Sequence, residues 1–149
     1  MKNMTLQARN FSLCLLALAV SIFALTGCEK KNDPFHKKGN TPDPHWTVET
    51  AQTMPISMTV TVRVEFANSE GSLAAFIDDT CCGVAEYVNG LYYLYITPLT
   101  EDGGGEVKLR FYSPDLKRIF KAKETFPFIN NEQIGTPNDP YTPEWTVDK

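Results

Sequence analysis

The sequence predicts an all-β protein, an antiparallel β-sandwich of about seven strands, and three observations lead to this fold class. Short segments whose apolar residues alternate with polar ones recur between residues 57 and 128. Turn-forming residues separate these segments, most clearly at Asn89-Gly90. The same region contains no convincing helical pattern. A small β-barrel is the alternative architecture.

The first two strands are expected at residues 57–66 and 73–78. In SMTVTVRVEF the apolar side chains share one face, as a half-buried strand requires, and they are Met58, Val60, Val62, Val64 and Phe66. A turn at residues 68–71 follows. The segment LAAFID is apolar on both faces and predicts a more central strand.

The remaining strands follow in order along the chain. Residues 83–88 and 91–97 flank Asn89-Gly90 and predict a hairpin, because both turn positions need positive φ. Residues 106–113 alternate, which predicts that Val107, Leu109 and Phe111 point inward. Residues 118–128 predict one or two more strands, with Pro127 suited to an edge. In the proline-rich ending only EWTV fits a strand.

The N-terminus has the pattern of a secretory signal peptide. Lys2 and Arg9 precede an apolar run at residues 11–24, which is shorter than the roughly 20 residues of a spanning helix. The ending LTGC resembles the lipobox of bacterial lipoproteins. That resemblance implies a signal peptide at 1–27, cleavage between Gly27 and Cys28, and a diacylglyceryl lipid on Cys28. An ordinary signal peptide or a buried apolar helix is the alternative.

The resemblance to lipoproteins also implies a location. A lipid on Cys28 makes the membrane a partner, and Glu29, which is not the aspartate associated with inner-membrane retention, favours the outer membrane. The periplasmic and cell-surface faces both remain open. Without Lys2 and Arg9 the formal net charge changes from −4 to −6, and no clustered basic face is present, so nucleic acid is not expected as a partner.

Composition divides the mature chain into three parts. Residues 28–44 are rich in lysine and proline and predict a lipidated, flexible tether, 45–140 the sandwich, and 141–149 a C-terminal tail. The sequence Trp-Thr-Val followed by an acid occurs at both Trp46 and Trp145. The second copy starts an incomplete repeat, or the match is coincidence or marks two edge strands of one domain.

Residues 57–140 contain LAAFIDDTCCGVA, YLYI, EVKLRFYS and GTPNDP in this order. These segments resemble a β-sandwich accessory domain of Bacteroidetes-type secreted and surface proteins, whose recurring pattern is an AAF strand, an acidic turn, Cys-Arg-Gly-Val-Ala, a Y-L-x-I strand, a V-x-F-x-x-Y strand and a late G-T-x-x-x-P. The resemblance implies architecture and an extracytoplasmic setting, without an activity. Cys81 matches the cysteine of the pattern, whereas Cys82 stands where arginine is usual.

Cys81 and Cys82 are the thiols left after Cys14 is cleaved off and Cys28 is lipidated. Adjacent Cα atoms lie about 3.8 Å apart, less than the roughly 4.4 to 6.8 Å of an ordinary disulfide. A strained vicinal bridge is the alternative to two buried or half-buried thiols. We expect the thiol pair to place Cys81 inward and Cys82 outward, where Cys82 is able to pair between chains.

The sequence predicts no catalytic residue, cofactor or metal site. The two histidines, His36 and His45, lie in or beside the expected tether, away from any nucleophile in the strands. Acidic residues at 78–79 and 101–102 have the chemistry of calcium ligands, but solvated turn residues are the favoured interpretation.

A binding surface has a better candidate. If residues 91–97 and 106–113 are neighbouring strands, Tyr93, Tyr95, Arg110 and Tyr112 form an outward strip able to stack on sugar rings or on a protein. Cross-strand pairing that only stabilises the sheet is the alternative. The expected function is a lipid-anchored binding module of the cell envelope without catalytic activity. The alternative is a carbohydrate-binding or accessory subunit of a surface glycan-uptake or hydrolase system.

Overall fold

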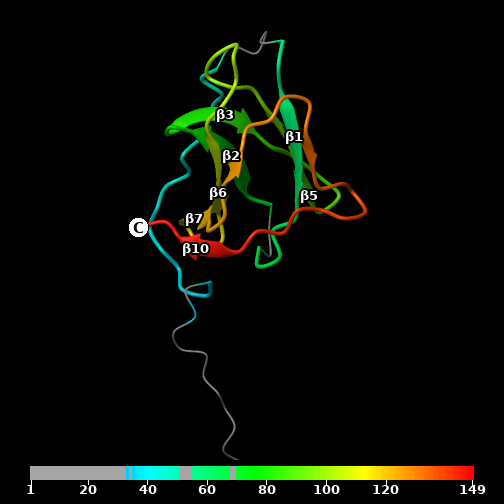
Figure 1. The fold of residues 1–149 in the computed structure, drawn as a ribbon. Helices are drawn as coiled ribbons and strands as arrows, with labels where there is room; N and C mark the ends of the chain where they lie inside the picture. The colour runs from blue at the N-terminus through cyan, green and yellow to red at the C-terminus, as the bar shows by residue number, and fades with distance from the viewer. Residues whose placement is uncertain (1–32, 34, 51–54, 68–69) are drawn as a thin grey trace, which may run out of the picture. The chain divides into compact units, whose positions relative to one another are not determined.

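The computed structural model describes residues 33, 35–50, 55–67 and 70–149, and its strands all follow residue 57 (Figure 1). This part of the chain contains no helix, so none that is long and apolar enough to cross a bilayer. The strands form two sheets that do not close into a barrel. The predicted β-sandwich is therefore confirmed, and the barrel alternative is wrong.

The smaller sheet has the strand order β4-β5-β1-β9. Its strands are β1 (Met58–Val62), β4 (Glu86–Val88), β5 (Leu91–Ile96) and β9 (Gln133–Ile134). β1 is antiparallel to β5 and parallel to β9. The two-residue strand β9 was not predicted, because so short a segment has no visible alternation.

The larger sheet has the order β10-β7-β6-β2-β3, with β8 pairing β6 off this path. Its strands are β2 (Ser72–Ile77), β3 (Thr80–Val84), β6 (Glu106–Ser113), β7 (Arg118–Ala122), β8 (Phe126–Pro127) and β10 (Trp145–Val147). β2 lies between β6 and β3 and its last five residues are buried. The prediction of a central strand there is confirmed, because both of its faces are covered.

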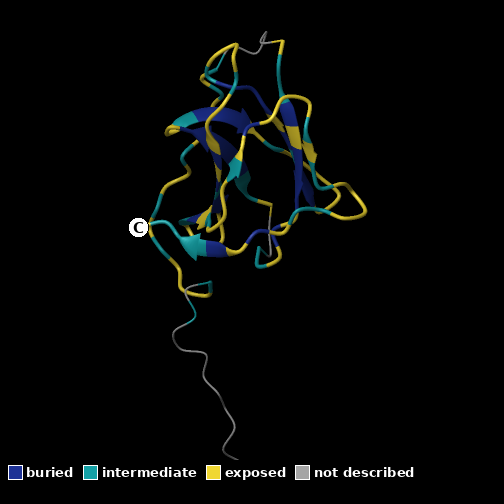
Figure 2. Cartoon of the chain, in the orientation of Figure 1, coloured by how far each residue is buried: buried dark blue, intermediate teal, exposed yellow. Residues whose placement is uncertain are grey.

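The hydrophobic core receives side chains from both sheets. Figure 2 shows dark blue, buried residues along the strands of both. The smaller sheet contributes alternate residues of β1 and β5, and the larger sheet contributes Leu73, Ala75, Leu109, Phe111 and Phe120, among others. The inward positions predicted for residues 107, 109 and 111 are confirmed, since all three are at most 1 % exposed.

The predicted hairpin between β4 and β5 is also confirmed. Asn89 has φ 51° and Gly90 has φ 83°, so both central residues of the turn are in the left-handed region. Tyr87 pairs with Tyr92 and Val88 with Leu91. Positive φ at both positions is the reason that asparagine followed by glycine marks this turn.

The prediction of a flexible tether up to residue 44 is wrong for the residues that the structure describes. The described residues from 33 onward belong to the same compact unit as the strands. The ring of Phe35 stacks on Phe120 at a centroid distance of 5.6 Å and lies 5.1 Å from Phe66. Gly39 and Thr41 donate backbone hydrogen bonds to the β6–β7 turn. The prediction rested on the low apolar content of the segment. One phenylalanine and a few backbone hydrogen bonds are nevertheless enough to hold the segment against the sheets.

The expected tail at residues 141–149 is likewise part of the sandwich. Residues 145–147 form β10, which is antiparallel to β7, and Trp145 is only 7 % exposed and belongs to the core. The prolines that disfavour a strand all precede β10, so they do not interrupt its pairing with β7.

The two Trp-Thr-Val segments lie at opposite edges of the larger sheet. Asp148, just after β10, donates its backbone N–H to Ile119 of β7, and the equivalent Glu49 donates to Cys81 of β3. Trp46 covers the outer face, whereas Trp145 points into the core. Both segments therefore border the larger sheet of the same domain, although only the second forms a strand.

Candidate binding surfaces

The structure separates the four residues of the predicted aromatic strip. Tyr93 and Tyr95 lie on β5 in the smaller sheet, whereas Arg110 and Tyr112 lie on β6 in the larger sheet. The prediction of one continuous strip is therefore wrong. Alternation along a strand tells which side chains share its face, but it does not tell which strands become neighbours.

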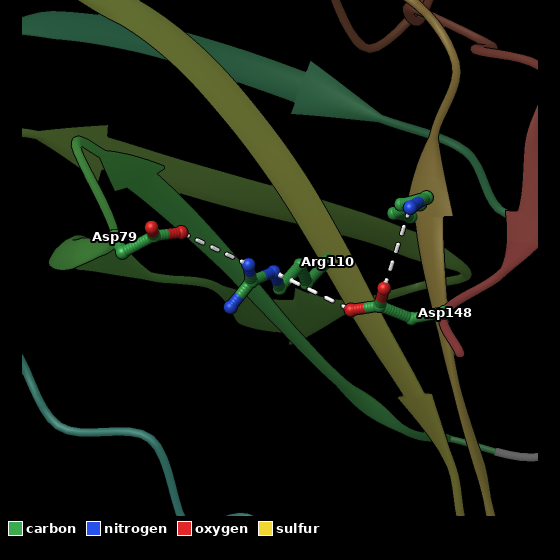
Figure 3. A network of polar contacts seen from close by, with 4 residues as sticks. Asp79, Arg110 and Asp148 are labelled. Atoms are coloured by element: carbon green, nitrogen blue, oxygen red, sulfur yellow. Dashed lines mark hydrogen bonds and ion pairs between the residues drawn. The ribbon is translucent and has the colours of Figure 1, made fainter.

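Tyr112 and Arg110 both have structural partners on the outer face of the larger sheet. Tyr112 is buried, and its hydroxyl donates a 3.3 Å hydrogen bond to the carbonyl of Thr41. The guanidinium of Arg110 lies between Asp79, at 3.1 Å, and Asp148, at 3.6 Å (Figure 3). Its central carbon lies 4.7 Å from the centroid of the Phe76 ring.

These contacts give Arg110 a bridging role. They tie the β2–β3 turn to the end of the chain beyond β10, and Lys121 joins the network 3.5 Å from Asp148. The side chain of Arg110 is 31 % exposed, so solvent screens the ion pairs and each contributes modestly to stability.

Tyr93 and Tyr95 retain the arrangement that a contact surface requires. Both point away from the core, because the register pairs Tyr93 with Thr61 and Tyr95 with Thr59, the outward residues of β1. Tyr95 is 52 % exposed and Tyr93 is half-buried. Two positions apart on one strand, they stand on the same face of the sheet.

The cysteine orientations are the reverse of those predicted. Cys82 points into the main core, and Cys81 lies on the outer face beneath Trp46 with Ala74 and Phe76. The pairing of β2 with β3 shifts between Ala75 and Phe76. This bulge changes the face on which the following residues emerge, which alternation alone does not reveal.

Both thiols are free and 1 % exposed. Burial raises the pKa of the Cys81 thiol and the pKa of the Cys82 thiol above the ordinary value, because a thiolate is poorly solvated there. Neither side chain is placed for pairing between chains.

The acidic residues lie at turns. Asp78 and Asp79, with φ of 47° and 66°, form the β2–β3 turn, and Asp79 is engaged by Arg110. Glu101 and Asp102 are exposed. Within the described ranges no three acidic, histidine or cysteine side chains approach one another closely enough to hold a metal ion. His36 and His45 contact the nearby aspartates 33 and 43.

The structure adds an aromatic hollow that sequence reasoning missed. Its volume is about 330 Å³, and three parts of the chain that are far apart in sequence line it: Phe35, Glu65 with Phe66, and residues 142–145. The Phe66 and Trp145 rings lie 6.1 Å apart at 71°, so they meet as walls and do not stack. The sequence contained two signals of this hollow, namely Phe35 in a polar segment and Trp145 among prolines.

A second hollow of about 400 Å³ lies beside the first. Arg63, Glu65, Tyr87 and Tyr92 line it, together with Val64, Ala67 and Gly90. Glu65 lines both hollows, so the two are adjacent along the segment that follows β1. Burial raises the pKa of Tyr92, whose hydroxyl accepts a 3.0 Å hydrogen bond from the backbone N–H of Gly71.

Polar groups of the aromatic hollow lie mainly at its rim. Glu65 and Glu144 are exposed, and Lys123 contacts Glu144 at 2.7 Å, which lowers the pKa of that carboxyl. The indole N–H of Trp145 is buried and has no hydrogen-bond partner among the described residues. A buried donor without a hydrogen-bond partner is uncommon in folded proteins.

Comparisons with protein-family models, curated proteins and solved structures find no match to this chain. The predicted cleavage site at Gly27 and Cys28 lies outside the described residues. The lipobox and the accessory-domain resemblance therefore stay predictions from the sequence.

Proposed function

We propose that this chain is a lipid-anchored binding module of the bacterial cell envelope with no catalytic activity of its own. The observation that carries the binding role is the pair of outward tyrosines on β5, with Tyr95 52 % exposed. The lipid anchor and the outer-membrane location rest on the LTGC motif.

Tyrosines on a sheet face suit recognition for physical reasons. A tyrosine ring offers a large apolar area with a polar hydroxyl, and few rotatable bonds are ordered when it binds. On one edge of β5, β1 presents the exposed Thr59, whereas Thr61 is buried, and on the other edge Glu86 of β4 pairs with Tyr93. An aromatic pair bordered by hydroxyl and carboxylate groups is suited to a protein surface or to a glycan.

The anchor is tested by substituting the lipidated residue. We expect Cys28→Ser to abolish labelling by an alkyne fatty acid and to move the protein from the membrane to the soluble fraction, because two acyl chains hold a protein stably on a bilayer. Cys81→Ser is the control and should keep both label and membrane association. A labelled, membrane-bound Cys28→Ser protein would contradict the lipobox.

The binding face is tested with Tyr93→Ala/Tyr95→Ala. On immobilised host and bacterial glycans and on isolated envelope proteins, we expect at least fivefold lower retention than for the unaltered chain, because the aromatic contact area is lost. Ile129→Ala is a matched control, since Ile129 is 49 % exposed and lies outside β5. Equal retention of the two variants would contradict a role for this face.

Carbohydrate binding, as a subunit of a surface glycan-uptake or hydrolase system, is the second candidate function. The specific observation in its favour is the aromatic hollow, with carboxylates at its rim.

A further inference from the structure

We infer that the aromatic hollow binds a neutral sugar ring and that the adjoining hollow accommodates a second ring of the same oligosaccharide. This inference rests on the carbohydrate-binding form of the proposed function. It assigns the ligand to residues other than the tyrosine pair on β5.

The walls of the hollow are apolar and held in place. Phe35 stacks almost parallel, at 11°, on Phe120, which is fully buried. Phe66 contacts Phe35, Phe120 and Trp145, with ring centroids between 4.5 and 6.1 Å apart. Because these rings are packed into the core on one side, a ligand does not have to order them on the other.

The size and polarity of the hollow suit a small amphipathic ligand. A volume of about 330 Å³ lies at the lower end of the usual range for ligand pockets. The carboxylates of Glu65 and Glu144 accept hydrogen bonds, and the hydroxyl of Thr142 already donates to the carbonyl of Pro140. The rim therefore favours a ligand that brings its own donors, as sugar hydroxyl groups do.

The charges around the hollow favour a neutral ligand over an ion. Two carboxylates at the rim disfavour an anion. A cation is disfavoured in turn, because Lys123 already neutralises Glu144 and the guanidinium-bearing Arg63 lines the adjoining hollow with Glu65. A ring with apolar faces and hydroxyl groups at its edge satisfies both conditions.

Glu65, which lines both hollows, extends the site from the first hollow to the second. Tyr87, which is 37 % exposed, lines the second hollow with Arg63. A ligand that fills both hollows contacts aromatic side chains at each end and the Glu65 carboxylate between them. A trisaccharide should therefore bind more tightly than a monosaccharide.

Trp145 provides a local reporter, because Trp46, the other tryptophan, lies on the outer face of the larger sheet. The full mature chain is titrated with maltotriose, laminaritriose, cellotriose and methyl β-glucoside, and choline serves as the cationic probe. Binding is followed by the fluorescence of a Trp46→Phe variant and by the indole N–H signal of Trp145 in the unaltered chain, so that the result does not depend on one variant.

We expect a saturable change at Trp145 with at least one trisaccharide and a weaker one with methyl β-glucoside. Glu65→Gln should weaken trisaccharide binding about tenfold or more, the factor expected for loss of a charge-assisted hydrogen bond. Glu101→Gln, which alters an exposed acid in the β5–β6 loop, should leave the affinity unchanged.

The inference is overturned by no saturable change with any trisaccharide, by a response to choline alone, or by equal affinities of the Glu65→Gln and Glu101→Gln variants. Tyr93→Ala/Tyr95→Ala should keep the Trp145 response. A glycan that is retained by the unaltered chain but leaves Trp145 unchanged would support the proposed function and reject this site.

Discussion

The two adjacent cysteines face opposite sides of the larger sheet, and each is enclosed by different neighbours. Cys82 belongs to the main core, and Cys81 lies under Trp46 with Ala74 and Phe76. The sulfur atom of Cys81 lies near the carbonyl group of Gly83, and that of Cys82 lies near the carbonyl group of Thr80. Both cysteines therefore act as small apolar side chains, and burial lowers the reactivity of their thiols.

Burial predicts that the two thiols resist alkylation in the folded protein. We expect iodoacetamide at neutral pH to leave Cys81 and Cys82 unmodified in buffer and to modify both in concentrated urea, because the reactive thiolate forms only when the sheet opens. Peptide mass mapping measures both states. Rapid modification of Cys82 in buffer would contradict its buried position in the core.

The same burial predicts that stability falls at alkaline pH. The pKa values of Cys81 and Cys82 are raised above the ordinary 9.0, so the folded chain holds these protons more tightly than the unfolded chain. The free energy of unfolding should therefore decrease as the pH rises above about 9. Tyr92 and Tyr141, whose pKa values burial also raises, act in the same direction from about 10 upward.

Urea titrations between pH 7.5 and 10 measure this dependence. In a Cys81→Ala/Cys82→Ala variant the decrease between pH 9 and 10 should be smaller, because neither state then has a thiol to titrate. An unchanged slope would exclude the cysteines as its source.

At the scale of elements, the segment before β1 acts as part of the sandwich. It supplies Phe35 to the core, and it crosses to the outer face of the larger sheet, where Thr41 accepts a hydrogen bond from Tyr112 and Trp46 covers Phe76. Gly39 approaches the β6–β7 turn so closely that an added Cβ would lie 2.6 Å from the carbonyl oxygen of Lys117.

Phe35→Ala measures how much this segment contributes. Because Phe35 is half-buried, we expect a loss of about 2 kcal/mol in the free energy of unfolding, roughly half the cost of removing a fully buried phenylalanine. Lys38→Ala, an exposed position of the same segment, should change it by less than about 0.5 kcal/mol. Equal small effects would show that the segment is a free tether after all.

The last strand has a comparable role at the other end of the chain. Trp145 contacts Phe66 and Phe111 within the core, and β10 extends the larger sheet beyond β7. We expect Trp145→Ala to lower the free energy of unfolding by about 3 to 5 kcal/mol. Thr146→Ala, whose neighbour in the register is the outward Lys121, should cost far less. Chemical denaturation measures both, and similar values would contradict a core position for Trp145.

In the described domain, the first described segment and the last strand both contribute to one core. The rings of Phe35 and Trp145 both contact Phe66, although 110 positions separate them in the sequence. Such long-range packing couples the two segments to the sheets, so the domain should unfold as one unit.

Hydrogen exchange tests this coupling. The backbone N–H groups of Gly39, bonded to Leu116, and of Lys123, bonded to Glu144, should exchange at rates close to those of the core strands. Fast exchange at Gly39 with slow exchange in β6 would mean that the first segment opens independently. Exchange followed by mass spectrometry or NMR distinguishes these outcomes.

Several features followed from the sequence because their causes are local. Alternation predicted that residues 107, 109 and 111 point inward, a doubly apolar segment predicted a central β2, and Asn89-Gly90 predicted the hairpin. Each depends on the geometry of a few consecutive residues, which the sequence contains in full.

The tertiary structure decided what depends on distant partners. It separated Tyr95 from Arg110, because a strand's periodicity does not name its neighbours, and it exchanged the faces of Cys81 and Cys82 through a bulge set by pairing with β2. It also joined Phe35, Phe66 and Trp145 around one hollow. Burial is a property of the assembled chain, and composition reports only what each segment could bury by itself.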